Sequence, residues 1–309
     1  MNNFHTPVLP REVIEGLRVK TSGWYIDGTI GGGGHTDGFL RRGVKVIGID
    51  QDWDSVSYLK KKFESEIKSR QLILVHGNFA DIKEIVGAYG IEKVDGILLD
   101  LGLSSFQIAT SGRGFTFSKD EPLDMRMDAS IARITAYDIV NKASEDELYE
   151  IFAKFGEEPK SKEIAARIIL RRQKKPIETT GELVDLILGG ASENRKIPVR
   201  PVRIPQGKYA PGIHPATRVF QALRIAVNSE IENLQKCLKD GFELLNEGSR
   251  FAIISFHSLE DRAVKLFFLK KQKEGMGKII NKKPIIAGSK EIELNRRSRS
   301  AKLRIIEKI

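Results

Sequence analysis

Four consecutive glycines at residues 31–34 constrain this chain more than any other stretch of its sequence. They follow a short apolar run, Trp24–Asp27, and precede a helical pattern that begins near residue 35. Glycine lets the backbone approach a ligand closely, and at the start of a helix it leaves peptide N–H groups free to donate. The same glycines would also suit a tight strand-to-helix turn without a ligand. Both interpretations place a βα unit at the beginning of the chain.

Further apolar runs alternate with helical stretches after this first unit. Three of them span Val44–Ile49, Leu72–His76 and Val94–Leu99. The alternation is typical of βαβ units on a parallel sheet, and it predicts half of a doubly wound α/β fold. Strand-like runs return at Phe251–Ile254 and Ala301–Ile309, so we expect both ends of the chain to share one sheet.

The middle of the chain shows helical spacing without strand-like alternation. It recurs over Glu145–Phe155, Lys162–Arg172 and Gly181–Gly189, and six prolines and glycines then crowd residues 198–212. This pattern predicts a helical insertion that ends in a loop. We therefore expect the sheet domain to be formed by residues 1–109 and 216–309, and the inserted helical domain by residues 110–215.

The distribution of charge indicates a polyanionic partner. The 309 residues carry a net charge of +10, and it is concentrated in two stretches. Residues 160–224 hold 14 Lys and Arg against 5 Asp and Glu, and residues 261–309 hold 15 against 5. Such segregation favours nucleic acid, because neutralising phosphates releases counterions. A solvated basic surface is the simpler alternative, and we assign it to the lysines at 60–62.

Other features exclude whole classes of protein. Cys237 is the only cysteine, so neither an internal disulfide nor a cysteine-based zinc site is possible, and we expect no metal. No apolar run is long enough to cross a membrane, and the first residues lack the apolar core of a signal peptide. We expect a soluble, cytoplasmic protein that does not bind membranes.

The ends of the expected strands limit the choice of cofactor. Asp50 ends the second apolar run, 19 residues after Gly31, where an acidic side chain accepts hydrogen bonds from ribose. The glycines do not complete the G-x-G-x-x-G fingerprint of dinucleotide sites, and no P-loop motif occurs. S-adenosylmethionine therefore suits the loop better than NAD. A nucleotide-dependent oxidoreductase and a non-catalytic RNA-binding protein remain as alternatives.

Five motifs together resemble those of the MraW family of ribosomal RNA small-subunit methyltransferases. They are DGTIGGGGHT at 27–36, DGILLDLGLSS at 95–105, LDMRMD at 123–128, HPATRVFQALR at 214–224 and ISFHSLEDR at 254–262. The motifs stand in the family's order and cover essentially the whole chain.

The resemblance implies a Rossmann-like, S-adenosylmethionine-dependent methyltransferase sheet interrupted by a helical domain. It also implies methylation of N4 of a cytidine in the decoding region of 16S ribosomal RNA. The implied cofactor-binding residues are Gly33, Gly34, His35, Asp50, Phe79, Asp100 and Gln107. The family usually has proline after the two serines, and this chain has Phe106 there, which leaves the backbone near Gln107 less fixed.

We expect Asp100 at the centre of methyl transfer, with Ser104 or Ser105 nearby as further catalytic residues. An acceptor there would help to restore nucleophilicity to the amine of cytosine. Capping of the turn that follows is the alternative role for Asp100. His257 could shape the acceptor pocket, although a structural role is the simpler one, and residues 123–128 could be an ion-paired turn.

The resemblance implies 16S ribosomal RNA as the partner. A large basic domain favours the assembled small subunit as substrate, and free RNA is the alternative. The target base must leave its stack to reach a cofactor, and basic side chains would hold the surrounding phosphates. The candidates are Arg171, Arg172, Lys174, Lys175, Arg195, Lys196, Arg200 and Arg203 in the insertion, and Arg296, Arg297, Arg299 and Lys302 near the C-terminus.

Overall fold

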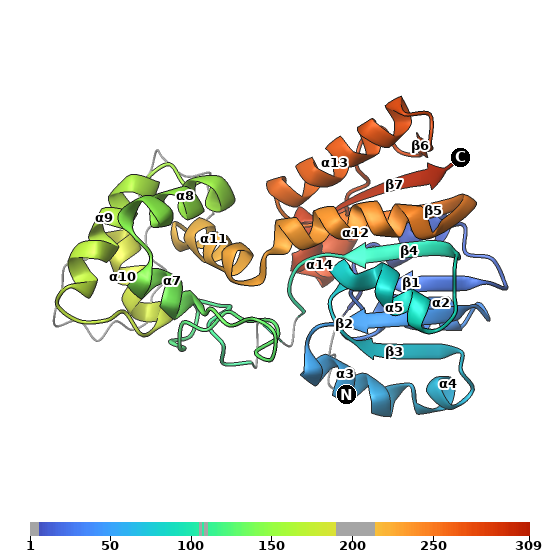
Figure 1. Ribbon diagram of the computed structural model, residues 1–309, viewed down its shortest axis with the longest axis horizontal. Helices are drawn as coiled ribbons and strands as arrows, with labels where there is room; N and C mark the ends of the chain where they lie inside the picture. The colour runs from blue at the N-terminus through green and yellow to red at the C-terminus, as the bar shows by residue number, and fades with distance from the viewer. Residues whose placement is uncertain (1–5, 105–106, 108–110, 190–213) are drawn as a thin grey trace. The chain divides into compact units, whose positions relative to one another are not determined.

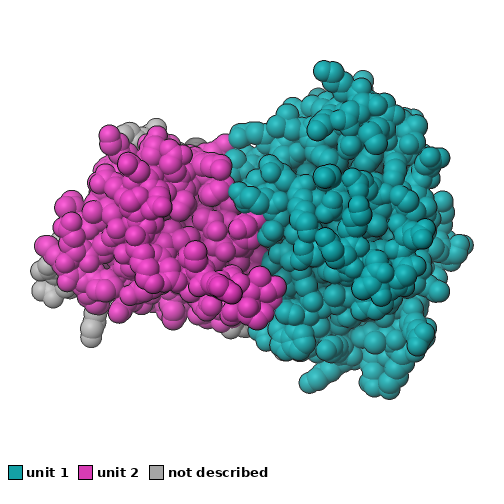
Figure 2. All heavy atoms as spheres, viewed as in Figure 1, with its two compact units in different colours: residues 1–105, 231–309 teal, residues 106–230 magenta. Residues whose placement is uncertain are grey.

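The computed structural model describes residues 6–104, 107, 111–189 and 214–309. The chain forms two compact units, unit 1 with residues 1–105 and 231–309 and unit 2 with residues 106–230 (Figure 2). Each unit has its own hydrophobic core. None of the helices in the described part of the chain is both long and apolar enough to span a membrane.

Unit 1 is built on a seven-stranded sheet in the order β3-β2-β1-β4-β5-β7-β6 (Figure 1). The strands from β3 to β5 in this order are parallel to one another, whereas β7 runs antiparallel to β5 and β6. The structure confirms the α/β fold and the sharing of one sheet by both ends of the chain. The strands are β1 (Trp24–Asp27), β2 (Lys45–Asp50), β3 (Leu72–His76), β4 (Val94–Asp100), β5 (Leu245–Ser255), β6 (Gly277–Ile279) and β7 (Lys302–Lys308).

Helices cover both faces of this sheet. In β4, Leu98 packs into the core on one face, whereas Ile97 and Leu99 pack into the core on the other. Burial on both faces explains why the strands are apolar at nearly every position. The helical segments of unit 1 are α1 (Pro10–Leu17), α2 (Gly34–Leu40), α3 (Trp53–Lys62), α4 (Glu64–Lys68), η1 (Phe79–Asp81), α5 (Ile82–Ala88), α12 (Glu230–Leu244), α13 (Ser258–Lys273), α14 (Ser289–Leu294) and η2 (Arg296–Ser300).

Unit 2 is helical, with one isolated bridge between Pro122 and Thr179 among its described residues. Its helices are α7 (Ala136–Lys142), α8 (Glu145–Gly156), α9 (Ser161–Arg172), α10 (Thr180–Leu188) and α11 (Ala216–Asn228). The apolar face of α11, including Val219 and Leu223, packs into the core of this unit. Unit 2 therefore extends to residue 230. From the sequence we expected the inserted domain to end at residue 215. An amphipathic pattern shows that a helix face is buried but not in which core.

Candidate functional site at the carboxyl edge of the sheet

The glycine loop joins β1 to α2 and needs glycine for its own conformation. Gly31 and Gly33 have φ angles of +50° and +74°, a region that residues with a side chain rarely adopt. A Cβ on Gly33 would lie 2.5 Å from the Phe63 ring, and one on Gly34 would lie 2.9 Å from Pro7. The tight turn therefore accounts for glycine at these positions before any ligand is considered.

Asp50 ends β2 and fastens this loop. Its Oδ2 accepts a hydrogen bond from the Gly31 N–H at 2.8 Å, and its Oδ1 accepts one from the Asp52 N–H at 2.8 Å. Burial raises the pKa of Asp50 to about 7, although these two hydrogen bonds act in the opposite direction. Each carboxylate oxygen can accept more than one hydrogen bond, so a ribose contact is compatible with this arrangement.

Asp27 secures the other side of the loop, a role that we did not predict from the sequence. Asp27 is buried at the end of β1, and its Oδ2 accepts a hydrogen bond from the Thr36 hydroxyl at 2.7 Å. Burial raises its pKa, against the lowering effects of His35 and Thr36. The only signal in the sequence was an acidic residue before the glycines and a hydroxyl residue after them.

His35 and Asp100 form a buried pair between α2 and the end of β4. His35 Nε2 lies 3.6 Å from Asp100 Oδ2, and the Asp100 N–H donates to Thr29 Oγ1 at 2.6 Å. Burial lowers the pKa of His35, but Asp100 and Asp27 outweigh it, so this pKa lies above its usual range. Among the described contacts, His35 Nδ1 and Asp100 Oδ1 are buried without a hydrogen-bond partner. Buried polar atoms are normally hydrogen-bonded, so a ligand or a solvent molecule is expected to bind to these two.

The remaining residues of the predicted site lie in different parts of the structure. Phe79 begins η1 after β3, and a Cβ on Gly28 at the end of β1 would lie 3.4 Å from its Cβ. Ser104 is partly buried four residues after Asp100, and Ser105 lies outside the described residues. Gln107 is buried in unit 2, where its carbonyl accepts a hydrogen bond from the Ser111 hydroxyl.

The lysine-rich face of α3 is not wholly solvated. Lys62 Nζ donates to the carbonyl of Gly32 at 2.7 Å, and burial lowers the pKa of this lysine. Lys60, Lys61 and Lys62 are all exposed, as we expected, but Lys62 also makes this contact with the glycine loop. Helical spacing alone gave no sign of this contact, because its partner lies 30 residues away in the glycine loop.

His257 caps the N-terminus of α13. Its Nδ1 accepts a hydrogen bond from the Glu260 N–H at 3.4 Å, and its Nε2 lies 3.1 Å from Glu260 Oε1. The Glu260 carboxylate also accepts from the N–H of Phe256 at 2.8 Å. These contacts give His257 a structural role at the beginning of this helix.

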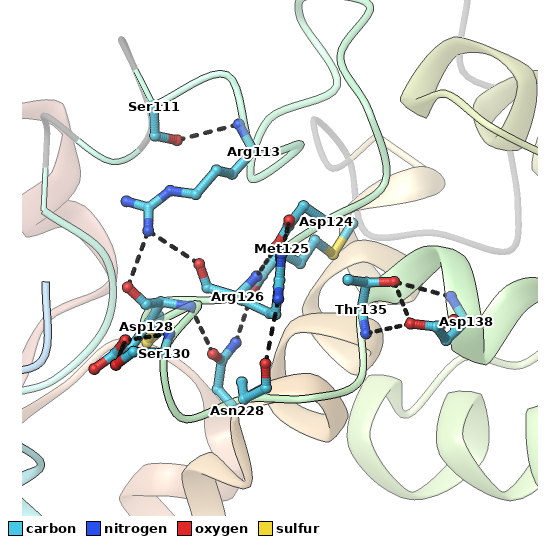
Figure 3. A network of polar contacts seen from close by, with 12 residues as sticks. Ser111, Arg113, Asp124, Met125, Arg126, Asp128, Ser130, Thr135, Asp138 and Asn228 are labelled. Carbon is cyan, nitrogen blue, oxygen red and sulfur yellow. Dashed lines mark hydrogen bonds and ion pairs between the residues drawn. The ribbon is translucent and has the colours of Figure 1, made fainter.

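Residues 123–128 form an ion-paired turn in unit 2 (Figure 3). The Arg126 guanidinium binds Asp124 through Nε at 2.8 Å and Nη2 at 2.6 Å. The Asn228 amide accepts from the Met127 N–H and donates to the Met125 carbonyl, each at 2.8 Å. The turn is thus tied internally and to the end of α11.

Several basic side chains that we expected to bind RNA are engaged within the protein. Arg171 and Arg172 donate to backbone carbonyls, Lys175 contacts Glu182, and Arg297 donates to the carbonyl of Leu103. The exposed candidates are Lys174, Lys175, Arg296 and Arg299. Lys302 is partly buried 3.4 Å from Asp261, and Arg195, Lys196, Arg200 and Arg203 lie outside the described residues.

Known proteins resemble this chain over its whole length. The family model described as the MraW methylase family matches residues 2–309. A relative named ribosomal RNA small subunit methyltransferase H in Acetivibrio thermocellus is 45% identical, with 99% of each chain covered. A relative of the same name in Clostridioides difficile is 44% identical, with both chains covered completely. A solved rRNA methylase from Streptococcus thermophilus has 10% identity and a TM-score of 0.42, covering 97% of this chain and 93% of its own.

Proposed function

Because the chain belongs to the MraW methylase family, we propose that it is a ribosomal RNA methyltransferase that uses S-adenosylmethionine. Its target would be N4 of a cytidine in the decoding region of 16S ribosomal RNA. The observation that carries this proposal is the pair of buried His35 and partly buried Asp100 at the carboxyl edge of the sheet, with buried polar atoms that lack a described partner. Ligands of open α/β sheets bind at this edge.

The residues at this edge fit the groups that the cofactor presents. Asp100 Oδ1 is a buried acceptor without a described partner, which suits an ammonium group such as that of the methionine moiety. Asp50 retains lone pairs for ribose hydroxyls, and Phe79 offers an apolar surface for a base. We assign cofactor binding to Gly33, Gly34, His35, Asp50, Phe79, Asp100 and Gln107. When bound, S-adenosylmethionine supplies an electrophilic methyl group.

Asp100 and its neighbours would prepare the acceptor nitrogen. The N4 lone pair of cytosine is delocalised into the ring, so the amine is a weak nucleophile. A carboxylate that accepts a hydrogen bond from this amine favours the geometry in which the lone pair can react, and it stabilises the positive charge that develops on nitrogen. Methylation replaces one hydrogen of the amine, and the released proton would pass through the accepting carboxylate to solvent. We assign these tasks to Asp100, with Ser104 and Ser105 as further hydrogen-bonding groups.

The exposed basic residues would hold the RNA while the target base is extruded. Arg296 and Arg299 are exposed on η2 in unit 1, and Lys174 is exposed after α9 in unit 2. We propose the assembled small ribosomal subunit as the substrate, which places the protein in the cytoplasm. No membrane partner forms part of this proposal.

The decisive experiment is methylation of small subunits that lack the modification. The protein is incubated with these subunits and labelled S-adenosylmethionine, and the RNA is then digested to nucleosides. We expect label in N4-methylcytidine from the decoding region, and none with Asp100→Ala. Label in another base or atom would refute the target, and absence of label with the wild-type protein would refute the activity.

Two binding measurements test the alternatives. Titration with NAD should give no binding, whereas an oxidoreductase would bind it. Titration with S-adenosylmethionine should give saturable binding, whereas a non-catalytic RNA-binding protein would bind RNA alone. Free 16S RNA and assembled subunits, compared as substrates, test the proposed preference for the particle.

A further inference from the structure

Residues 289–300, which form α14 and η2, contact two chain segments next to the cofactor edge of unit 1. We call residues 289–300 the C-terminal clasp. One segment precedes α1 and lies against the glycine loop, and the other follows β4. The contacts come from Glu291, Asn295 and Arg297, which lie more than 190 residues away in sequence from the groups that they bind.

The first contact holds the N-terminal segment. Glu291 Oε1 accepts from the Leu9 N–H at 2.8 Å, and Asn295 Nδ2 donates to the Thr6 carbonyl at 3.2 Å. Leu9 has left-handed φ and ψ angles of 51° and 43° and precedes α1 without a side-chain cap of its own. The Glu291 carboxylate therefore supplies the acceptor that this helix start lacks, at the end where a negative charge is favourable.

This segment bears directly on the loop that carries His35. Pro7 lies so close to Gly34 that a Cβ there would approach it to 2.9 Å. Pro7 stands between Thr6 and Leu9, the two residues that the clasp holds. Glu291 is also near enough to raise the pKa of His35. The clasp thus contributes both a packing restraint and a negative charge on the histidine side of the site.

The second contact holds the segment after β4. The Arg297 guanidinium donates a hydrogen bond to the carbonyl of Leu103, three residues beyond Asp100. Ser298, the next residue in η2, is fully buried, and its N–H and hydroxyl both donate to the Asn295 carbonyl. Arg297 is therefore presented from a fixed turn, whereas Arg299 in the same turn is exposed.

We propose that the C-terminal clasp positions both walls of the methyl-transfer site, with Glu291, Asn295 and Arg297 as positioning residues. Glu291 and Asn295 hold residues 6–9, which pack against the glycine loop on the cofactor side of the site. Arg297 holds residues 101–104, which follow Asp100 on the side of the acceptor base. The proposal rests on the methyl-transfer function above. It also assigns Arg297 to positioning rather than to RNA phosphates.

The test separates cofactor affinity, turnover and RNA affinity in the full-length protein. Glu291→Ala should raise the Kd for S-adenosylmethionine about threefold to tenfold, the usual worth of one hydrogen bond. Arg297→Ala should lower kcat on small subunits about tenfold or more, because small displacements of reacting groups are costly, and should leave the KM for the subunit unchanged. Arg297→Lys should recover part of kcat, since lysine retains a donor, and it replaces Arg297→Ala if that variant does not fold.

Matched variants come from the same segment. Glu293→Ala and Lys290→Ala remove exposed charges from α14 and should change neither constant. Arg299→Ala should raise the KM for the subunit and reduce its salt dependence, as loss of a phosphate contact does. If Arg297→Ala behaves like Arg299→Ala, with normal kcat, Arg297 binds RNA and the proposal is wrong.

Hydrogen exchange tests the contacts of the clasp independently of whether the protein methylates RNA. Exchange at the Leu9 amide should quicken in Glu291→Ala, and exchange at residues 101–104 should quicken in Arg297→Ala, whether or not the protein methylates RNA. Unchanged exchange at both places would overturn the clasp. A wild-type protein that fails to bind S-adenosylmethionine would instead overturn the proposed function.

Discussion

The cofactor edge in unit 1 and the turn at residues 123–128 in unit 2 both gather carboxylates, but they treat them differently. At the turn, Asp124 is bound by the Arg126 guanidinium, which holds the pKa of Asp124 below its usual range despite burial. At the cofactor edge, burial raises the pKa values of Asp27 and Asp50, and the ion pair described for Asp100 is with His35 rather than with an arginine or lysine. A carboxylate bound on both oxygens by its own protein stabilises the fold, whereas one with an oxygen lacking a described partner, such as Asp100, keeps its capacity for a ligand.

The largest expected effect is on turnover at the cofactor edge. Asp100→Asn should lower kcat on the order of 100-fold, because the amide accepts hydrogen bonds less strongly and carries no charge to oppose the one that develops on N4. Cofactor affinity is measured separately by titration. Asp54→Asn removes an exposed carboxylate at the start of α3 and should leave kcat unchanged. Normal turnover in Asp100→Asn would mean that Asp100 merely caps its turn.

The second effect is a pH dependence with opposite signs in the two regions. Because the pKa of Asp50 is raised to about 7 from an unfolded value near 3.8, its contribution to stability is complete below pH 4 and is lost as the pH rises through 7. Asp124, with a lowered pKa, contributes above its unfolded pKa and loses that contribution as the pH falls. Unfolding free energies are measured from pH 3 to pH 8.

Two substitutions isolate these contributions. Asp50→Asn should remove the decline of stability between pH 4 and pH 7, and Asp124→Asn should remove the loss below pH 4. An unchanged pH profile in Asp50→Asn would show that folding does not raise the pKa of this carboxylate. Cofactor affinity offers a further check, since ribose hydroxyls favour the carboxylate form and affinity should rise as the pH passes 7.

A smaller effect is expected on the stability of the paired turn at neutral pH. Asp124→Ala should lower the free energy of unfolding of unit 2 by about 1–2 kcal/mol, because it removes a bidentate ion pair whose side chains are partly exposed. Hydrogen exchange within α7 and α11 measures this change. Asp146→Ala, an exposed residue of α8, is the control. Equal stability of the two variants would place Asp124 among the ligand-binding carboxylates after all.

The sequence predicted what depends on local pattern. Apolar runs and their spacing located the strands of unit 1 and the helices of unit 2, and Asp50 could be placed at a strand end from its position alone. The hydrogen bonds from the Thr36 hydroxyl to Asp27 and from Arg297 to the Leu103 carbonyl left no periodic signal, because each joins two single residues that only folding brings together. The sequence also could not predict that α11 packs into the core of unit 2, because an apolar helix face does not indicate which element it packs against.

The smallest expected effect concerns Lys62, the only cation for which the described contacts include a hydrogen bond to the glycine loop of the cofactor edge. Its ammonium group holds the Gly32 carbonyl, and burial has already lowered its pKa. Lys62→Met keeps an apolar stem against Phe63 but removes the donor, so the loop should loosen and the Kd for S-adenosylmethionine should rise about threefold. Lys61→Met, one position earlier and exposed, should leave the Kd unchanged. If both variants bind alike, the loop is held by Asp27 and Asp50 alone, and the cofactor edge needs no cation of its own.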